Sequence, residues 1–342
     1  MNFKKLIIIA AAFVPFALHA QVWQPKKAVL MTRFAKDVDP KNVLPEYPRP
    51  QMEREKWMNL NGLWQYQPGL NAAEAIPQGK LANTILVPFA VESALSGVME
   101  QHDRLWYRRK FTIPSSWKGE HILLHFGAVD YESEVFINGK SLGKHTGGYD
   151  PFTYDVTPAL KSAGEQELTV RVYDPTDDAG FPRGKQTLHP QGIMYTSTTG
   201  IWQTVWLEPV PAVNINDVRI TPDADHSAVK ITVTADGAAA GYTVFVKVKD
   251  GDKVVQLSSG KAGVEINVPV AKAKLWSPDS PFLYDLEITL NNGGKAVDAV
   301  SSYFGMRKIS IGEEGGYKKL FLNNKFLFQI GPLDQGFWPD GI

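Results

Sequence analysis

The chain has 342 residues and no cysteine, and its basic and acidic side chains balance at 36 each. This length allows two or three domains. The balanced charge argues against nucleic acid, whose phosphates require a basic face, and against anionic membrane surfaces. Without cysteine the chain lacks disulfides, a thiolate nucleophile and cysteine-ligated zinc, so core burial alone must stabilise it.

The first twenty residues have the pattern of a secretory signal peptide. Two lysines precede an apolar run from Leu6 to Leu18, and the small residue Ala20 follows. A membrane anchor is the rival interpretation, but this run of 13 residues is shorter than the roughly 20 that span a bilayer. We expect residues 1–20 to be removed on export, and the protein to be periplasmic or extracellular and not membrane-bound.

The next two regions predict an extended lead-in and a first β domain. Residues 21–55 are rich in proline and charge and lack periodicity. In residues 56–209, stretches such as Leu168–Val172 alternate apolar and polar side chains, the period of a half-buried strand. Asn138-Gly139 suits a type I′ hairpin turn. Many short strands with glycine and proline turns predict a sandwich or jelly roll.

Residues 210–304 predict a second β domain. The prolines at 209 and 211 form a stiff joint. Val244–Val248 and Leu286–Leu290 alternate in the same way, and Asp250-Gly251 supplies a tight turn. This pattern fits an immunoglobulin-like β-sandwich without the usual cysteine pair.

The last region, residues 305–342, has a different pattern. Phe326–Ile330 is apolar except for Gln329, as expected for a strand buried in a parallel sheet. A loop rich in aromatic and acidic side chains follows Gly331-Pro332. We interpret this region as the first strand of a truncated barrel, with the chain ending in the loop after that strand.

Several strings of residues occur in a fixed order along these regions. They are Leu60-Asn-Gly-Leu-Trp64, Trp106-Tyr-Arg-Arg109, Gly127-Ala-Val-Asp-Tyr131, Val135-Phe-Ile-Asn-Gly139, Gly143-Lys-His-Thr-Gly-Gly-Tyr149, Pro151-Phe-Thr-Tyr-Asp-Val-Thr157, Gly200-Ile-Trp-Gln-Thr-Val-Trp206, Leu275-Trp-Ser-Pro278, Pro281-Phe-Leu-Tyr284, Phe304-Gly-Met-Arg307 and Leu322-Asn-Asn-Lys325. Together they resemble glycoside hydrolase family 2. The first seven resemble its sugar-binding jelly roll, the next two its immunoglobulin-like domain, and the last two the entry to its barrel.

The resemblance implies a mainly β fold here, followed by a (β/α)8 barrel that hydrolyses a carbohydrate substrate, a β-linked glycoside, without cofactors. Such retaining enzymes use two glutamates about 5–5.5 Å apart, one protonating the leaving oxygen while the other attacks the anomeric carbon. A barrel needs about 250 residues and carries these glutamates on its later strands. Residues 305–342 are too few, so we assign no catalytic residue and expect this chain alone to be inactive.

The resemblance places Asp334, Gln335 and Trp338 in a loop that faces the active site of such a barrel. A carboxylate and an amide can accept hydrogen bonds from sugar hydroxyls, and an aromatic ring can cover the apolar side of a sugar. We therefore expect these three residues to bind substrate. The alternative is that Trp338 packs on the jelly roll and that Asp340 only begins a turn.

Two departures from the family weaken the best-known sugar assignments. Many β-galactosidases and β-glucuronidases have Arg-Gly-x-Asn-Arg-His where this chain has Ile330-Gly-Pro-Leu-Asp-Gln335. Galactosidase relatives also have an acid shortly before the Ser-Gly-Ile-Phe-type string, whereas Ile193–Thr199 contains none. Tyr195 and Gln191 are further candidate contacts in that stretch.

Other possible sites have simpler explanations. Asp130 and Glu132 resemble paired carboxylates, but strand alternation predicts one shared face, where they would pair with Arg108–Lys110. The histidines lack His-Glu-x-x-His spacing, so no metal site is predicted, and no glycine-rich phosphate loop is present.

The leading hypothesis is the N-terminal part of an exported retaining β-glycoside hydrolase. The alternative is a non-catalytic carbohydrate-binding protein of two β-sandwich domains. Such a protein would end on a sandwich strand and would not need residues 326–342. A purely structural adhesin would leave the barrel-entry strings unexplained.

Overall fold

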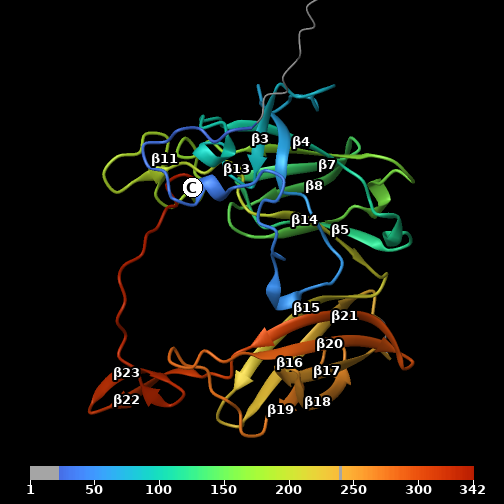
Figure 1. Ribbon diagram of the computed structural model, residues 1–342, viewed down its shortest axis with the longest axis vertical. Coiled ribbons are helices and arrows are strands. Elements are labelled where there is room, and N and C mark those ends of the chain that lie inside the picture. Colours follow the sequence, from blue (N-terminus) through green and yellow to red (C-terminus); the bar gives the residue numbers. More distant parts are fainter. Residues whose placement is uncertain (1–22, 239–240) are drawn as a thin grey trace, which may run out of the picture.

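The computed structural model describes residues 23–238 and 241–342, so the predicted signal peptide lies outside the described residues. The described chain is mainly β, as predicted, with two β-sandwiches stacked along its long axis (Figure 1). Across these residues the helices are short 3-10 turns: η1 (Ala35–Asp37), η2 (Pro50–Met52), η3 (Ala94–Ser96), η4 (Ser115–Trp117) and η5 (Thr157–Ala159). None of them has the length and apolar character of a membrane-crossing helix.

The first sandwich pairs a six-stranded sheet with a four-stranded one, and both are antiparallel. The larger sheet has the order β3-β2-β4-β10-β7-β8 and the smaller one the order β1-β14-β5-β9. The larger contains β2 (Gly62–Pro68), β3 (Asn83–Val87), β4 (Arg104–Phe111), β7 (Glu132–Ile137), β8 (Lys140–Thr146) and β10 (Gln166–Tyr173). The smaller contains β1 (Met58–Asn59), β5 (His121–Phe126), β9 (Phe152–Asp155) and β14 (Val205–Val210). Chain neighbours often lie in different sheets, as in a jelly roll.

Two small sheets extend this jelly roll at one end. One joins β6 (Val129–Asp130) to β13 (Gly200–Ile201), and the other joins β11 (Gln186–Thr187) to β12 (Tyr195–Thr196) in parallel. They organise the long connection between β10 and β14.

Strand alternation determines which side chains fill the jelly roll. Leu168, Val170 and Val172 are at most 1 % exposed and pack in one core with Trp64 and Phe126. At the end of β7 the predicted hairpin turn is confirmed, because Asn138 and Gly139 have φ values of 52° and 81°. Both angles are positive, as a type I′ turn requires.

The second sandwich has its own core and is immunoglobulin-like, as predicted. One sheet has the order β15-β16-β19 and the other β18-β17-β20-β21. The strands are β15 (Asn214–Asp223), β16 (Ala228–Asp236), β17 (Thr243–Asp250), β18 (Lys253–Lys261), β19 (Ile266–Pro269), β20 (Tyr284–Asn292) and β21 (Lys295–Phe304). Met52 of the lead-in packs into this core, so the lead-in contacts both sandwiches.

A buried carboxylate, Glu208 of β14, lies where the two sandwiches meet the lead-in. Its side chain is 0 % exposed. Arg49 donates to it at 2.9 Å, and the hydroxyl of Tyr47 donates to its other oxygen. Nε of Arg54 lies 3.7 Å from Glu208, and Nε2 of His125 lies 3.1 Å from it. Three of these four partners come from the lead-in.

Arg54 continues this network into the second sandwich. It donates to Asp298 of β21 at 2.5 Å and to the carbonyl oxygen of Ile215 in β15 at 2.7 Å. The second carboxylate oxygen of Asp298 accepts from the Ile215 amide at 2.7 Å. The lead-in therefore connects β14 of the jelly roll to both sheets of the second sandwich (Figure 1).

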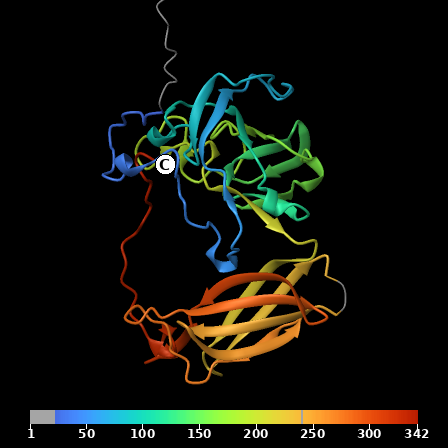
Figure 2. The same ribbon diagram turned by 45° about the vertical axis from the view of Figure 1, so that its right-hand side comes forward.

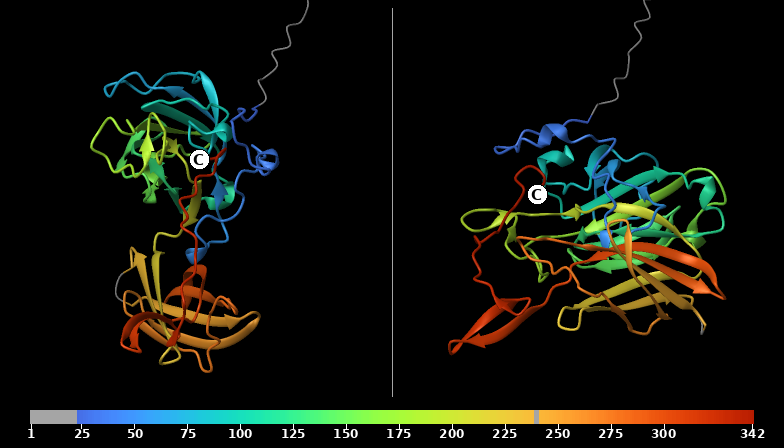
Figure 3. Two further views of the ribbon diagram at one scale, coloured as in Figure 1. Left: turned by 90° about the vertical axis from the view of Figure 1, so that its left-hand side faces the viewer. Right: turned by 60° about the horizontal axis from the view of Figure 1, so that its bottom comes forward.

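The C-terminal region forms a small sheet and then an extended tail. The sheet contains β22 (Ile309–Glu314), β23 (Tyr317–Leu322) and β24 (Lys325–Phe326). The strand predicted for Phe326–Ile330 stops at Phe326, because the described residues offer no parallel neighbour for it to pair with. Phe328 and Ile330 are consequently 71 % and 89 % exposed. The tail then returns to the jelly roll (Figures 2 and 3).

Replacing Glu208 by alanine tests the junction. We expect Glu208→Ala to lower the free energy of unfolding by about 3 kcal/mol, because Arg49 would lose its counter-charge and the buried Arg54 would keep only Asp298. Denaturant titration at neutral pH measures the change. Glu265→Ala, at an exposed glutamate before β19, is the control and should unfold like the wild type.

The same pair of proteins gives a pH test. Burial alone would raise the pKa of Glu208, but His125 and Arg49 outweigh it and hold this pKa at about 2. The stabilisation is complete above about pH 4.5 and is lost as the pH falls towards 2. The wild type and Glu208→Ala should therefore converge in stability in acid. A difference that stayed constant down to about pH 2 would contradict this role.

Candidate functional site

The tail brings one predicted site residue, Gln335, against the long connection of the jelly roll. The side-chain oxygen of Gln335 accepts from Nζ of Lys185 at 2.5 Å and from the hydroxyl of Tyr195 at 3.3 Å. The Tyr195 ring also stacks on Phe337, with centroids 4.7 Å apart and planes 9° apart. We call Lys185, Tyr195, Gln335 and Phe337 the tail contact surface. It offers an ammonium group, a phenol and an amide to a polar ligand.

The other two predicted residues make different contacts. The Asp334 carboxylate accepts from the amide of Gly336 at 2.7 Å and so stabilises its own turn. Trp338 is 52 % exposed, and its ring lies 5.8 Å from that of Phe34 in the lead-in. Substrate contact by Asp334, Gln335 and Trp338 stays a prediction.

Asp340 anchors the end of the tail. It is 0 % exposed, and its carboxylate accepts from the amide of Thr32 at 2.6 Å. Its carbonyl oxygen accepts from the amide of Leu95 at 2.9 Å. Asp340 therefore does more than begin a turn, because it holds the tail to the lead-in and to η3.

Three buried carboxyl groups hold the connection that carries Tyr195. Glu92 accepts from the amide of Thr199 at 3.0 Å and from the hydroxyl of Ser197 at 3.2 Å. Asp174 accepts from the hydroxyl of Thr199 at 3.0 Å. Asp130 accepts from Nε2 of Gln186 at 3.1 Å. These bonds fix the path of residues 186–199 and thereby the position of Tyr195.

Burial changes the acidity of these groups. It raises the pKa of Glu92 to about 8 and that of Asp130 to about 7, and it also raises the pKa of Asp174. Their hydrogen-bond partners are amides and hydroxyls rather than cations, and these bonds lower the pKa values by less than burial raises them. Among the described residues, no group of three or more His, Asp or Glu side chains is arranged to hold a metal.

The predicted pairing of Asp130 and Glu132 with Arg108–Lys110 is wrong. Asp130 lies in β6, which pairs with β13, whereas Glu132 lies in β7 of the six-stranded sheet. The alternation rule fails because the strand breaks between them. Arg108 lies 3.5 Å from Glu167 instead, and Lys110 lies 2.7 Å from Glu165.

Sequence reasoning missed Glu92, Asp174 and Lys185. Glu92 had a usable signal, because it is a single charge in the apolar stretch from Phe89 to Leu95 and such a charge must be accommodated by burial or by pairing. Lys185 had none, since only the return of the tail brings Gln335 to it.

Comparison with known proteins agrees with this architecture. Residues 82–208 match the family model described as glycosyl hydrolases family 2, sugar binding domain, and residues 213–307 match the model described as glycosyl hydrolases family 2. These matches cover most of the jelly roll and the second sandwich. The chain belongs to glycoside hydrolase family 2.

Among its relatives, a β-galactosidase of Thermoanaerobacter pseudethanolicus is 26 % identical over 69 % of this chain and 33 % of the relative. A β-glucuronidase of Paenibacillus borealis is 24 % identical over 83 % of this chain and 50 % of the relative. The structure of a β-glucuronidase from Ruminococcus gnavus in complex with D-glucuronic acid shares the fold. The two structures superpose with a TM-score of 0.66 and 20 % sequence identity. The match covers 84 % of this chain and 51 % of the glucuronidase chain. The chain thus spans about half, or less, of these proteins.

Glu92→Gln tests the effect of the buried acids. Because burial raises the pKa of Glu92, its contribution to stability should be full below about pH 4.5 and fall as the pH rises to about 8. The glutamine variant should therefore melt at a higher temperature than the wild type at about pH 9, and lose this advantage near pH 5. Glu313→Gln, at an exposed glutamate of β22, should follow the wild type. Parallel melting curves for Glu92→Gln and wild type across this range would refute the assignment.

Proposed function

We propose that this chain is the N-terminal part of an exported retaining β-glycoside hydrolase, whose two catalytic glutamates belong to a barrel outside these residues. The observation that carries the proposal is the order of the two domains, each matched by a model of one hydrolase family. The share of its relatives that the chain spans also supports it. The barrel would supply one carboxyl group that protonates the leaving oxygen and another that attacks the sugar.

In this proposal the chain's own residues position the substrate. The tail contact surface presents Gln335 and Tyr195 side by side, fixed through Lys185 and Phe337. An amide and a phenol at fixed separation can hydrogen-bond the hydroxyls of a sugar. The buried acids keep Tyr195 in place, so they would act by positioning and not by touching substrate.

The substrate class is a β-linked glycoside. The relatives include both β-galactosidases and β-glucuronidases. This chain has Ile330-Gly-Pro-Leu-Asp-Gln335 where many of those enzymes have basic and amide side chains, and it lacks the acid before Gly200. We therefore propose neither galactose nor glucuronic acid as the sugar that this chain recognises.

An activity assay tests whether hydrolysis requires the barrel. Residues 21–342 should not hydrolyse aryl β-galactoside, β-glucuronide, β-mannoside or β-glucoside above the spontaneous rate, because they lack the pair of glutamates. The same residues fused in frame to the barrel of a family 2 enzyme are the active comparison. Enzyme-like turnover by residues 21–342 alone would overturn the proposal.

Export is tested separately. Expressed in a Gram-negative bacterium, the full chain should appear in the periplasm or medium, shortened at its N-terminus, with cleavage after Ala20. N-terminal sequencing of the exported protein measures the cut. Deleting residues 2–20 should keep the protein in the cytoplasm, and export of that variant would contradict the signal-peptide assignment.

A further inference from the structure

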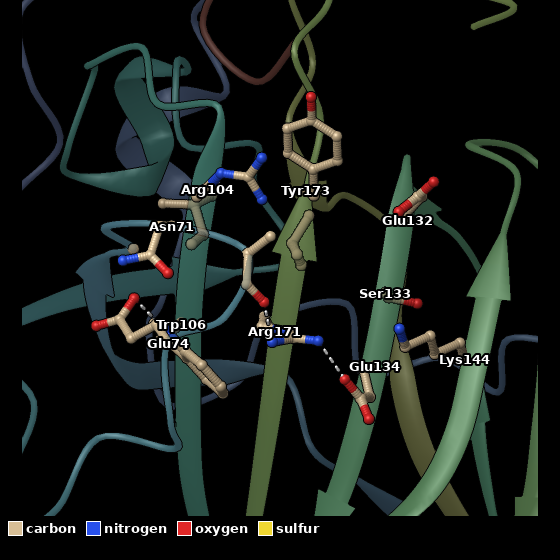
Figure 4. A pocket seen from close by; sticks show the side chains of 14 residues that line it. Asn71, Glu74, Arg104, Trp106, Glu132, Ser133, Glu134, Lys144, Arg171 and Tyr173 are labelled. Carbon is tan, nitrogen blue, oxygen red and sulfur yellow. Dashed lines mark hydrogen bonds and ion pairs between the residues drawn. The ribbon is translucent and has the colours of Figure 1, made fainter.

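The outer face of the six-stranded sheet carries a groove of about 200 Å³. Its floor comes from β4, β10, β7 and β8, and its wall from the connection between β2 and β3 (Figure 4). We call it the outer-face groove. Its charged side chains are Glu74, Arg104, Glu132, Glu134, Lys144 and Arg171, and Asn71 and Tyr173 add polar groups. No residue of the tail contact surface lines it.

Sheet register explains why these side chains meet. Arg104 of β4 lies opposite Tyr173 of β10, which lies opposite Glu132 of β7. The next outer row runs through Trp106, Arg171, Glu134 and Lys144 on four neighbouring strands. Because side chains alternate across a strand, the residues between these rows point into the core and the rows face outwards.

Contacts within the groove hold several side chains in place. Arg171 donates to Glu134 at 2.5 Å, and Nε1 of Trp106 donates to Glu74 at 3.0 Å. The guanidinium carbon of Arg104 lies 3.8 Å from the centroid of the Tyr173 ring. A ligand would therefore meet side chains that are already ordered, which lowers the entropy cost of binding.

Two polar side chains at the rim are not committed to such contacts. Lys144 and Glu132 are exposed, and neither forms an ion pair with any residue in 23–238 or 241–342. Figure 4 shows them on adjacent strands, beside the Arg171–Glu134 pair. They offer one donor group and one acceptor group on the same side of the groove.

The charges that line the groove select the class of ligand. Three cations (Arg104, Lys144 and Arg171) face three carboxylates (Glu74, Glu132 and Glu134). A polyanion would be repelled by the carboxylates, and an apolar ligand would leave the charges desolvated. Alternating donors and acceptors match the hydroxyl groups of a neutral sugar, which both donate and accept.

We propose that the outer-face groove is a binding site for a neutral glycan, taking about one sugar ring of a longer chain. The volume is below the roughly 300–1,000 Å³ of pockets that enclose a drug-sized ligand, as suits one ring of a chain that continues into solvent. This site goes beyond the proposed function, since it needs neither the tail nor a barrel. It would hold the protein on a polysaccharide while hydrolysis takes place elsewhere.

Binding of defined neutral tetrasaccharides tests the site. Residues 21–342 are titrated with cellotetraose, xylotetraose, mannotetraose and β-1,4-galactotetraose by calorimetry and by NMR. At least one should bind with a Kd between about 10 μM and 10 mM. Lys144→Ala and Glu132→Ala should each weaken that binding by about tenfold, equivalent to losing one or two hydrogen bonds.

The controls separate this site from general effects. Lys140→Ala removes an exposed lysine from the same strand, β8, outside the groove, and should bind like the wild type. Melting temperatures should match across all variants.

The site is refuted if none of the four tetrasaccharides binds, or if binding survives both groove substitutions. Tighter binding of tetragalacturonate than of the neutral sugars would refute the neutral class. Because no hydrolysis is measured, failure here leaves the activity assay to decide the proposed function.

Discussion

The burial of the Glu208 carboxylate is the constraint on which the arrangement of the molecule depends. A carboxylate with no exposed surface is stable only if cations and hydrogen-bond donors surround it. The lead-in supplies most of them through Tyr47, Arg49 and Arg54. Because Arg54 also donates to Asp298, the need to neutralise one side chain joins the lead-in, the jelly roll and the second sandwich. The lead-in is thus part of the interface rather than a loose cover.

The jelly roll also contains buried carboxyl groups that have no cationic partner among the described residues. Glu92, Asp130 and Asp174 are buried among amides and hydroxyls, and burial raises the pKa of each. Around Glu208 burial is outweighed by His125, Arg49 and the hydrogen bond from Tyr47, so the pKa of Glu208 falls. The same type of side chain is therefore held ionised in one place and pushed towards its neutral form in the other. The first arrangement fixes domains, and the second fixes the connection that carries Tyr195.

The two surfaces proposed to bind sugar depend on different parts of the structure. The tail contact surface depends on long-range contacts between residues 185–195 and 335–337. The outer-face groove depends only on the register of one sheet and on the β2–β3 connection. In the proposed hydrolase, the tail contact surface would bind the reacting sugar, and the outer-face groove would bind another part of the same glycan. The family match over residues 82–208 includes the strands that form the floor of the outer-face groove, whereas residues 335–337 of the tail contact surface lie outside the matched ranges.

The sequence by itself determined the β class, the two sandwiches, the Asn138-Gly139 turn and the family, because alternation and turn chemistry are local properties. It could not determine which charges pair. The pairing predicted for Asp130 failed because the strand breaks between Asp130 and Glu132, and Asp130 pairs with β13 in another sheet. It also could not show that the apolar stretch after Phe326 would lack a partner strand, or that Gln335 would meet Lys185 across 150 residues. Contacts between distant segments depend on how whole sheets pack, so only the tertiary structure decided them.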